Sequence, residues 1–227
     1  MSLIKIENCR IENSSSILIQ NMSWEMNDGE VWLVTGPNGS GKADFLNALS
    51  GTTGIKITPN TDGLFSDIFY DSTETVSLER AARLIQEERE NDESDYIEGG
   101  VDIGRTGRVF ISQALKTQTR LENEPAIKLC GIEKILDRGL KYMSTGEIRR
   151  TLLARALVSG KQLLLLSDPF AGLDVQSRTI LLDFFDSIAR KKGCPHIILG
   201  MERWHEIPDA VTHVLEFRDK EVSYCGA

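Results

Sequence analysis

Hydrophobic and polar residues alternate in the N-terminal part of the chain and then give way to longer apolar runs. Three short alternating segments, separated by Asn and Ser, have the period of strands with one buried face: Leu3–Glu7, Ile17–Gln20 and Met22–Met26. The continuous apolar run Val31–Thr35 indicates a strand buried on both faces, and Asp44–Leu49 has helical spacing. The pattern therefore predicts antiparallel strands followed by a strand, a loop and a helix.

The middle third of the chain has mainly helical periodicity. Residues 77–92 place Leu and Ala on one side of a predicted helix, with acidic residues toward its end. Three further segments have the same periodicity: Val109–Thr117, Ala126–Leu136 and Glu147–Ser159. The polar, glycine-containing segment Asn91–Arg108 is typical of an exposed loop. We expect residues 77–160 to form an inserted helical subdomain within one domain that spans residues 1–227.

Strands and helices alternate again in the last third of the chain. The predicted elements are the strand Leu163–Leu166, the helix Val175–Lys191 and the strands His196–Gly200 and Val211–Phe217. Strands that alternate with helices form largely parallel sheets. The chain is thus predicted to be an α/β protein with a mainly parallel core sheet, an N-terminal antiparallel β subdomain and the helical insertion.

Composition narrows the class of protein without naming a function. A hydrophobic fraction of 41% and a charged fraction of 26% are typical of globular proteins and argue against disorder. The net charge of −8 disfavours nonspecific binding of nucleic acid. No apolar run approaches the roughly 18 residues that cross a bilayer, so we expect a cytoplasmic protein. The four cysteines lack C-x-x-C spacing and are expected to be reduced and mostly buried.

The loop after the first buried strand has the spacing of a phosphate-binding P-loop. Its G-x-x-x-x-G-K pattern is formed by Gly36, Asn38, Gly39, Ser40, Gly41 and Lys42. The glycines let consecutive N–H groups point at phosphate oxygens, the helix N-terminus adds a favourable dipole, and the lysine reaches the terminal phosphates. An ordinary glycine-rich turn is the alternative, but the strand before it and the helix after it favour ATP binding.

Position 43 departs from this pattern. The motif normally has Ser or Thr there, whose hydroxyl binds Mg²⁺, and this chain has Ala43. A methyl group cannot be a metal ligand, and Mg²⁺ requires near-octahedral oxygen coordination. We therefore expect phosphate binding with weakened Mg²⁺ binding.

A second motif resembles the signature of ABC ATPases. Residues 143–147 read Met-Ser-Thr-Gly-Glu, against L-S-G-G-Q in the family. In that family the signature contacts the γ-phosphate bound on the opposite domain of a head-to-tail dimer. The resemblance implies this role for Ser144, Thr145, Gly146 and Glu147. Ser144 and Glu147 also form an S-x-x-E capping box, and the two interpretations are compatible because an anion-facing helix needs a capped N-terminus.

Residues 163–174 resemble the Walker B strand and the D-loop of the same family. The aspartate that the family associates with Mg²⁺ falls on Ser167, and its catalytic glutamate falls on Asp168. The aspartate side chain is one methylene shorter, and a positioning error near 1 Å can cost roughly a hundredfold in rate. The D-loop aspartate of the family falls on Asp174. A buried strand that ends in a turn is the alternative for this segment alone.

Other positions of the family pattern are also changed. The switch histidine falls on Glu202, and the nearby His205 is out of register. No glutamine occurs from Leu64 to Ile85, where the family has a glutamine that senses γ-phosphate and metal. Arg10 stands near the expected adenine-stacking aromatic and is a planar cation suited to stacking.

Three segments resemble the ModF or PhrA type of ABC protein more narrowly, a type named for the molybdate operon and for photorepair. They are Asp102–Thr106, Tyr142–Glu147 and Arg203–Pro208. Members of this type are soluble proteins with two ABC domains in tandem. The resemblance implies that this chain is the first ABC domain of such a pair, with a second domain beyond the end of the chain.

Three functions are compatible with these motifs. The first, which we expect, is an ATP-binding domain that forms a composite dimer with a tandem domain or a second copy and hydrolyses little ATP itself. The second is an active ATPase that energises a membrane permease from the inner face of the cell membrane, in molybdate or other transport. The third is a non-catalytic interaction module that keeps the ABC fold.

Overall fold

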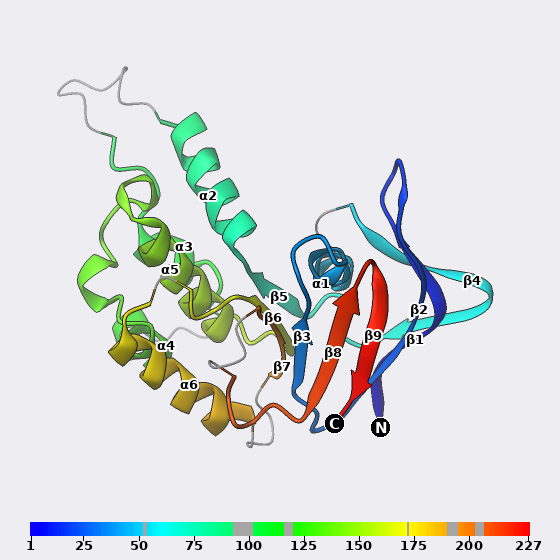
Figure 1. Ribbon diagram of the computed structural model, residues 1–227. Helices are drawn as coiled ribbons and strands as arrows, with labels where there is room; N and C mark the ends of the chain where they lie inside the picture. The colour runs from blue at the N-terminus through cyan, green and yellow to red at the C-terminus, as the bar shows by residue number, and fades with distance from the viewer. Residues whose placement is uncertain (52–53, 93–101, 116–119, 172, 190–194, 203–206) are drawn as a thin grey trace. The chain divides into compact units, whose positions relative to one another are not determined.

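The computed structural model describes residues 1–51, 54–92, 102–115, 120–171, 173–189, 195–202 and 207–227 (Figure 1). These residues divide into two compact units, each described by itself below. The first unit comprises Met1–Thr75, Gln162–Asp168 and Phe185–Ala227. The second comprises Val76–Lys161 and Pro169–Phe184. Strands predominate in the first unit and helices in the second.

The strands form a three-stranded sheet, in the order β2-β1-β4, and a six-stranded sheet, in the order β5-β6-β7-β3-β8-β9. Their bounds are β1 Ser2–Glu12, β2 Ile17–Asn27, β3 Trp32–Thr35, β4 Lys56–Asp67, β5 Thr73–Val76, β6 Leu163–Ser167, β7 His196–Gly200, β8 His213–Arg218 and β9 Glu221–Gly226. The small sheet is antiparallel. In the large sheet β3 pairs in parallel with β7 and β8, and β6 pairs in parallel with β7. The predicted mainly parallel core sheet and N-terminal antiparallel sheet are therefore confirmed.

Helix α1 (Lys42–Ser50) lies between the two sheets (Figure 1). Its apolar side joins the main hydrophobic core, to which both sheets also contribute. Phe45 is fully buried, and its ring centroid lies 5.2 Å from that of Trp24 and 5.5 Å from that of Phe217. This packing fixes the first turn of α1, and with it the end of the glycine-rich loop.

The second unit contains short helices around α5. The bounds of the helices are α2 Leu78–Glu90, α3 Gly107–Ser112, α4 Pro125–Leu129 and α5 Thr145–Val158, and those of the 3-10 turns are η2 Leu121–Asn123, η3 Glu133–Ile135 and η4 Leu140–Tyr142. Helix α6, Val175–Ala189, begins in this unit. The single helix predicted for residues 126–136 is wrong, because Gly131 adopts φ 58° and separates α4 from η3. Arg108, predicted to lie in a loop, belongs to α3, which Thr106 caps by accepting from the Val109 N–H (3.3 Å).

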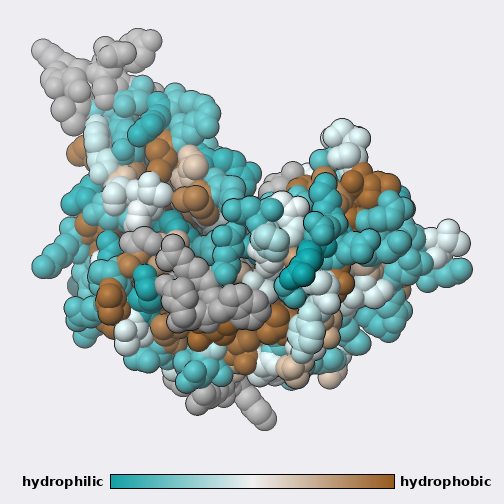
Figure 2. Space-filling model, viewed as in Figure 1, coloured by the Kyte–Doolittle hydropathy of each residue, from teal (hydrophilic) through white to brown (hydrophobic). Residues whose placement is uncertain are grey.

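The visible face in Figure 2 is mostly hydrophilic, and its hydrophobic residues form separate patches. None of the helices in the described ranges is long and apolar enough to span a membrane. Cys9 and Cys130 are buried free thiols, whereas Cys225 is exposed. Burial raises the pKa of the Cys130 thiol to about 12, so this thiol stays protonated and acts as an apolar side chain at neutral pH.

Candidate nucleotide-binding site

The predicted site residues of the first unit follow neighbouring parallel strands. Gly36 begins the loop after β3, Asp168 follows β6, and Glu202 comes shortly after β7. The Met201 N–H donates to the Val34 carbonyl (3.0 Å) and joins the ends of β7 and β3. Because the carboxyl ends of parallel strands meet at one edge of a sheet, these residues converge there, where open α/β sheets bind their ligands.

The backbone of the P-loop requires glycine at two positions. Gly36 has φ 141°, and a Cβ built on it would lie 2.3 Å from the Phe217 carbonyl oxygen and 2.6 Å from Ser40 Oγ. Gly41 has φ 105° and is the N-cap of α1, and a Cβ there would lie 3.1 Å from Ile19 Cδ1. Only glycine fits these two positions, where the loop packs closely against β8 and β2.

Ser40 has an unsatisfied polar atom inside this loop. The residue is only 3% exposed, and its Oγ has no hydrogen-bond partner among the described residues. Its backbone is held in place, because its carbonyl accepts from the Lys220 N–H (2.9 Å). A buried unpaired hydroxyl costs about 1–3 kcal/mol, and a phosphate oxygen would satisfy it. The first N–H groups of α1 also lack intrahelical partners, so the loop fits the phosphates of ATP.

Lys42 forms an ion pair that the sequence did not predict. Its Nζ donates to Glu202 Oε1 at 3.2 Å. The lysine side chain is 10% exposed and the glutamate side chain 43% exposed, so the carboxylate is the partner on the solvent side. Glu202, which resemblance places at the switch-histidine position, therefore lies beside the lysine of the glycine-rich loop.

The residues beside the loop do not fit the Mg²⁺ site that the resemblance implies. Ala43, in the first turn of α1, has no oxygen in its side chain, and Ser167, at the end of β6, lacks the carboxylate that the family has there. Asp168 has φ 45°, and its N–H donates to the Gly200 carbonyl (2.7 Å). Throughout the described residues, no group of three or more His, Cys, Asp or Glu side chains could hold a metal ion. We therefore assign no chemical step to a metal here.

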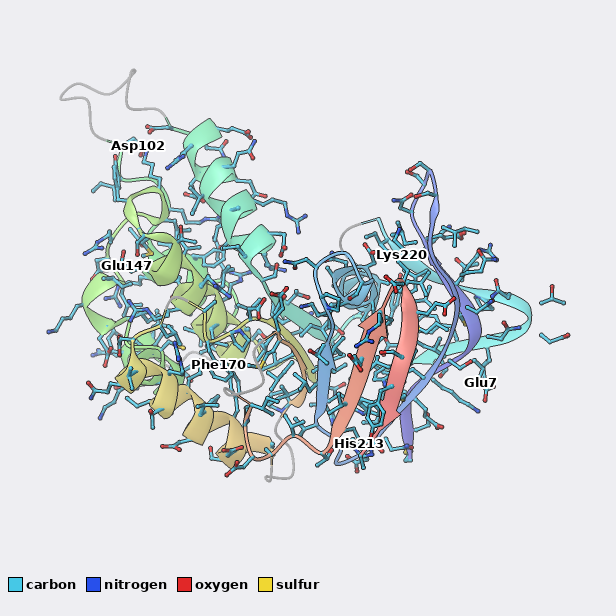
Figure 3. All side chains as sticks on the ribbon, in the orientation of Figure 1. Glu7, Asp102, Glu147, Phe170, His213 and Lys220 are labelled. Atoms are coloured by element: carbon cyan, nitrogen blue, oxygen red, sulfur yellow. The ribbon has the colours of Figure 1, made fainter. Side chains whose placement is uncertain are left out.

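A polar pocket of about 530 Å³ lies between β2 and the turn that joins β8 to β9. Its polar lining residues are Gln20, Asn21, Ser23, Asp219, Lys220 and Glu221. Asp219 and Lys220 both have positive φ, 51° and 64°, as a two-residue hairpin turn of type I′ requires. Lys220, labelled in Figure 3, also bonds to Ser40 through its backbone, so the pocket adjoins the P-loop.

Two other residues considered for the nucleotide site are Arg10 and His205. Arg10, considered for adenine stacking, is on β1, where its Nε donates to Glu12 at 2.7 Å. The ring of His213 lies 4.9 Å from that of the buried Trp32, so this histidine packs against the core. His205 falls outside the described residues.

The signature residues lie in the second unit, at the N-terminus of α5. Ser144 is the N-cap and accepts from the Glu147 N–H (3.3 Å), while the Glu147 carboxylate accepts from the Ser144 N–H (2.8 Å). Thr145 and Gly146 are the first two residues of the helix. Glu147, labelled in Figure 3, also pairs with Arg138 Nη1 at 2.7 Å. The expected capping box is therefore formed.

The D-loop residue Asp174 directly precedes α6 in the same unit. Its carbonyl accepts from the Arg178 N–H at 3.0 Å, which is the bond expected at a helix start. The Asp174 residue is exposed.

We expect Glu147→Ala to destabilise the protein by about 1 kcal/mol at pH 7, since it removes half of the capping box. The hydrogen bond from the Ser144 N–H, together with Arg138, holds the pKa of Glu147 below its usual range. The stabilisation is therefore complete above the unfolded-state pKa of about 4.3 and is lost as the pH falls through the lower folded-state pKa. Urea unfolding from pH 7 to pH 3 measures this, with the exposed Glu87→Ala in α2 as the control. A loss that does not shrink in acid would contradict the assignment.

A buried strand, a glycine-rich turn and a helix that begins with a lysine, at the carboxyl edge of a parallel sheet, define a P-loop nucleotide-binding domain. A family model described as ABC transporter matches residues 19–171. The chain belongs to this family.

Individual relatives agree with the family assignment. The chain is 33% identical to the ABC transporter ATP-binding protein ModF of Escherichia coli (strain K12), over 100% of this chain and 44% of the relative. It is 29% identical to an uncharacterized ABC transporter ATP-binding protein of Schizosaccharomyces pombe, over 99% of this chain and 47% of the relative. The chain thus spans about half the length of these curated relatives.

A solved ATP-binding cassette, a dimer in a post-hydrolysis state bound to ADP and phosphate, has the same fold. It matches with a TM-score of 0.68 over 98% of this chain and 97% of that chain, at 14% identity.

Proposed function

We propose that this chain binds ATP at its P-loop and hydrolyses little of it. The observation that supports the proposal is a loop whose backbone requires glycine at positions 36 and 41, with the unpaired Ser40 Oγ inside it, beside positions that offer no carboxylate to a metal. Those positions are Ala43 and Ser167. In this proposal the chain keeps the groups that bind phosphate and lacks side chains that position a metal.

The residues of the loop have distinct tasks in this proposal. The backbone N–H groups of residues 36–43 bind phosphate oxygens, Ser40 Oγ donates a further hydrogen bond, and Lys42 supplies the charge. Asp168 stands where the family has a longer glutamate, so its carboxylate reaches less far toward an attacking water. Because small positioning errors slow a reaction strongly, we expect slow turnover at this site.

We further propose that a second ABC domain completes the functional unit. The capped N-terminus of α5, with Ser144, Thr145 and Gly146, is suited to face an anion on that partner. The first two curated relatives are about twice as long as the region they share with this chain, which supports a tandem pair. In this arrangement residues 1–227 form one ABC domain, and residues 77–160 form its helical subdomain. We further propose that the protein works in the cytoplasm and that its role is related to molybdate.

Isothermal titration with ATP, in Mg²⁺ and in EDTA, tests whether ATP binding is independent of Mg²⁺. We expect similar dissociation constants in both conditions for the natural chain. The double variant Ala43→Thr, Ser167→Asp restores a hydroxyl and a carboxylate, and we expect Mg²⁺ to strengthen its ATP binding by about tenfold or more, as one or two charge-assisted bonds would. Ala43→Val, which adds volume but no oxygen, is the matched control. Absence of ATP binding in both conditions would refute the proposed function.

A further inference from the structure

An acidic side chain lies within reach of the lysine that the proposed function assigns to phosphate. Glu202 Oε1 is 3.2 Å from Lys42 Nζ. The lysine is largely buried and the glutamate nearly half exposed, so a ligand that arrives from solvent meets the carboxylate before it meets the ammonium group. The natural chain therefore supplies its own anion to its P-loop.

Strand pairing accounts for the position of this carboxylate. Val34 of β3 pairs with Gly200 of β7, and the Met201 N–H continues the pairing to the Val34 carbonyl (3.0 Å). Glu202 is the next residue, and Lys42 lies at the end of the loop that follows β3. The pairing of two adjacent strands thus brings the two residues close enough for their side chains to meet.

A bound nucleotide would compete with Glu202 for the same cation. An ammonium group has three N–H donors, so it can hold a carboxylate and a phosphate together, but the two anions then repel each other at short range. The triphosphate of ATP extends further than the diphosphate of ADP and carries more negative charge. The repulsion consequently acts more strongly on ATP than on ADP.

We propose that Glu202 determines nucleotide selectivity at this P-loop by lowering the affinity for ATP more than the affinity for ADP. The proposal rests on the nucleotide binding proposed above. Glu202 narrows the preference for ATP over ADP that the P-loop alone would have, because the bound state either keeps both anions on Lys42 against their repulsion or displaces the carboxylate.

The test compares the natural chain with Glu202→Gln, which keeps the size and a hydrogen-bond acceptor for Lys42 but removes the charge. Dissociation constants for ATP and ADP are measured by titration calorimetry in EDTA at low salt. We expect ATP to bind about tenfold more tightly to the variant, as the loss of one nearby like charge implies, and ADP to gain clearly less. The gain for ATP should shrink at high salt, because salt screens exposed charges.

Glu25→Gln is the matched control, because it removes the same charge from an exposed position on β2. Binding of both nucleotides with an unchanged ATP-to-ADP affinity ratio in Glu202→Gln would overturn the selectivity proposal alone. An equal change of that ratio in Glu25→Gln would overturn it too, since net charge would then be the cause. Failure of the natural chain and of Glu202→Gln to bind either nucleotide would overturn the proposed function, and the selectivity with it. Thermal unfolding verifies that both variants fold.

Discussion

Replacing Gly36 by alanine is expected to destabilise the protein by about 2–6 kcal/mol, the sum of a strained backbone and an overpacked site, and to abolish ATP binding. The residue has φ 141°, where side chains are disfavoured. Its added methyl group would lie 2.3 Å from the Phe217 carbonyl oxygen, which belongs to β8 and cannot retreat without disturbing the sheet. The P-loop backbone must therefore shift to remove the clash, and its N–H groups would turn away from the phosphates.

Gly39→Ala is the matched control for this variant. Gly39 also has a positive φ, 78°, but nothing lies within 4 Å of a Cβ built there. Its cost should therefore be confined to the left-handed backbone, roughly 1–2 kcal/mol. Urea unfolding and ATP titration of both variants separate the two effects. If Gly36→Ala were no more harmful than Gly39→Ala, the close approach to β8 would not be what requires glycine.

The sequence predicted the elements whose signals are local. The apolar run of β3, the glycines after it and the spacing of α1 stand within twenty residues of one another, and the structure places all three as expected. Strand β4 was missed because most of its residues are exposed or half-buried, and it contains Pro59 and Gly63, which weaken a strand pattern. Strand β9, likewise mostly exposed, has too few buried residues to show an alternation.

The candidate site was predictable residue by residue but not as an arrangement. The spacing of the P-loop identified Lys42, and a resemblance identified Glu202 as the occupant of the switch position. Their contact depends on the strand order, which places β7 beside β3 although more than 150 residues separate them in the chain. No local pattern contains that order. The sequence therefore showed only that the switch histidine is replaced by Glu202. The structure shows in addition that the Glu202 carboxylate pairs with Lys42.

The core behind the P-loop sets how firmly the site is held. Phe45 is four residues after the N-cap of α1, and its N–H donates to the Gly41 carbonyl (2.9 Å) in the first hydrogen-bonded turn of the helix. Its ring packs between Trp24 of the antiparallel sheet and Phe217 of the parallel sheet. One side chain thus joins both sheets to the helix that carries Lys42.

Phe45→Ala is accordingly expected to cost about 3–5 kcal/mol of folding free energy, the usual loss for a buried aromatic residue that leaves a cavity. Tyr70→Ala removes a larger side chain, but Tyr70 is 81% exposed, so its cost should stay within about 0.5 kcal/mol. Phe45→Leu, which fills most of the cavity, should fall between them. Denaturant unfolding measures all three, and ATP titration of the folded Phe45→Leu variant shows whether a looser α1 also weakens binding. A loss for Phe45→Ala as small as that for Tyr70→Ala would mean that the P-loop helix is held mainly by its hydrogen bonds to the loop, and not by the aromatic core beneath it.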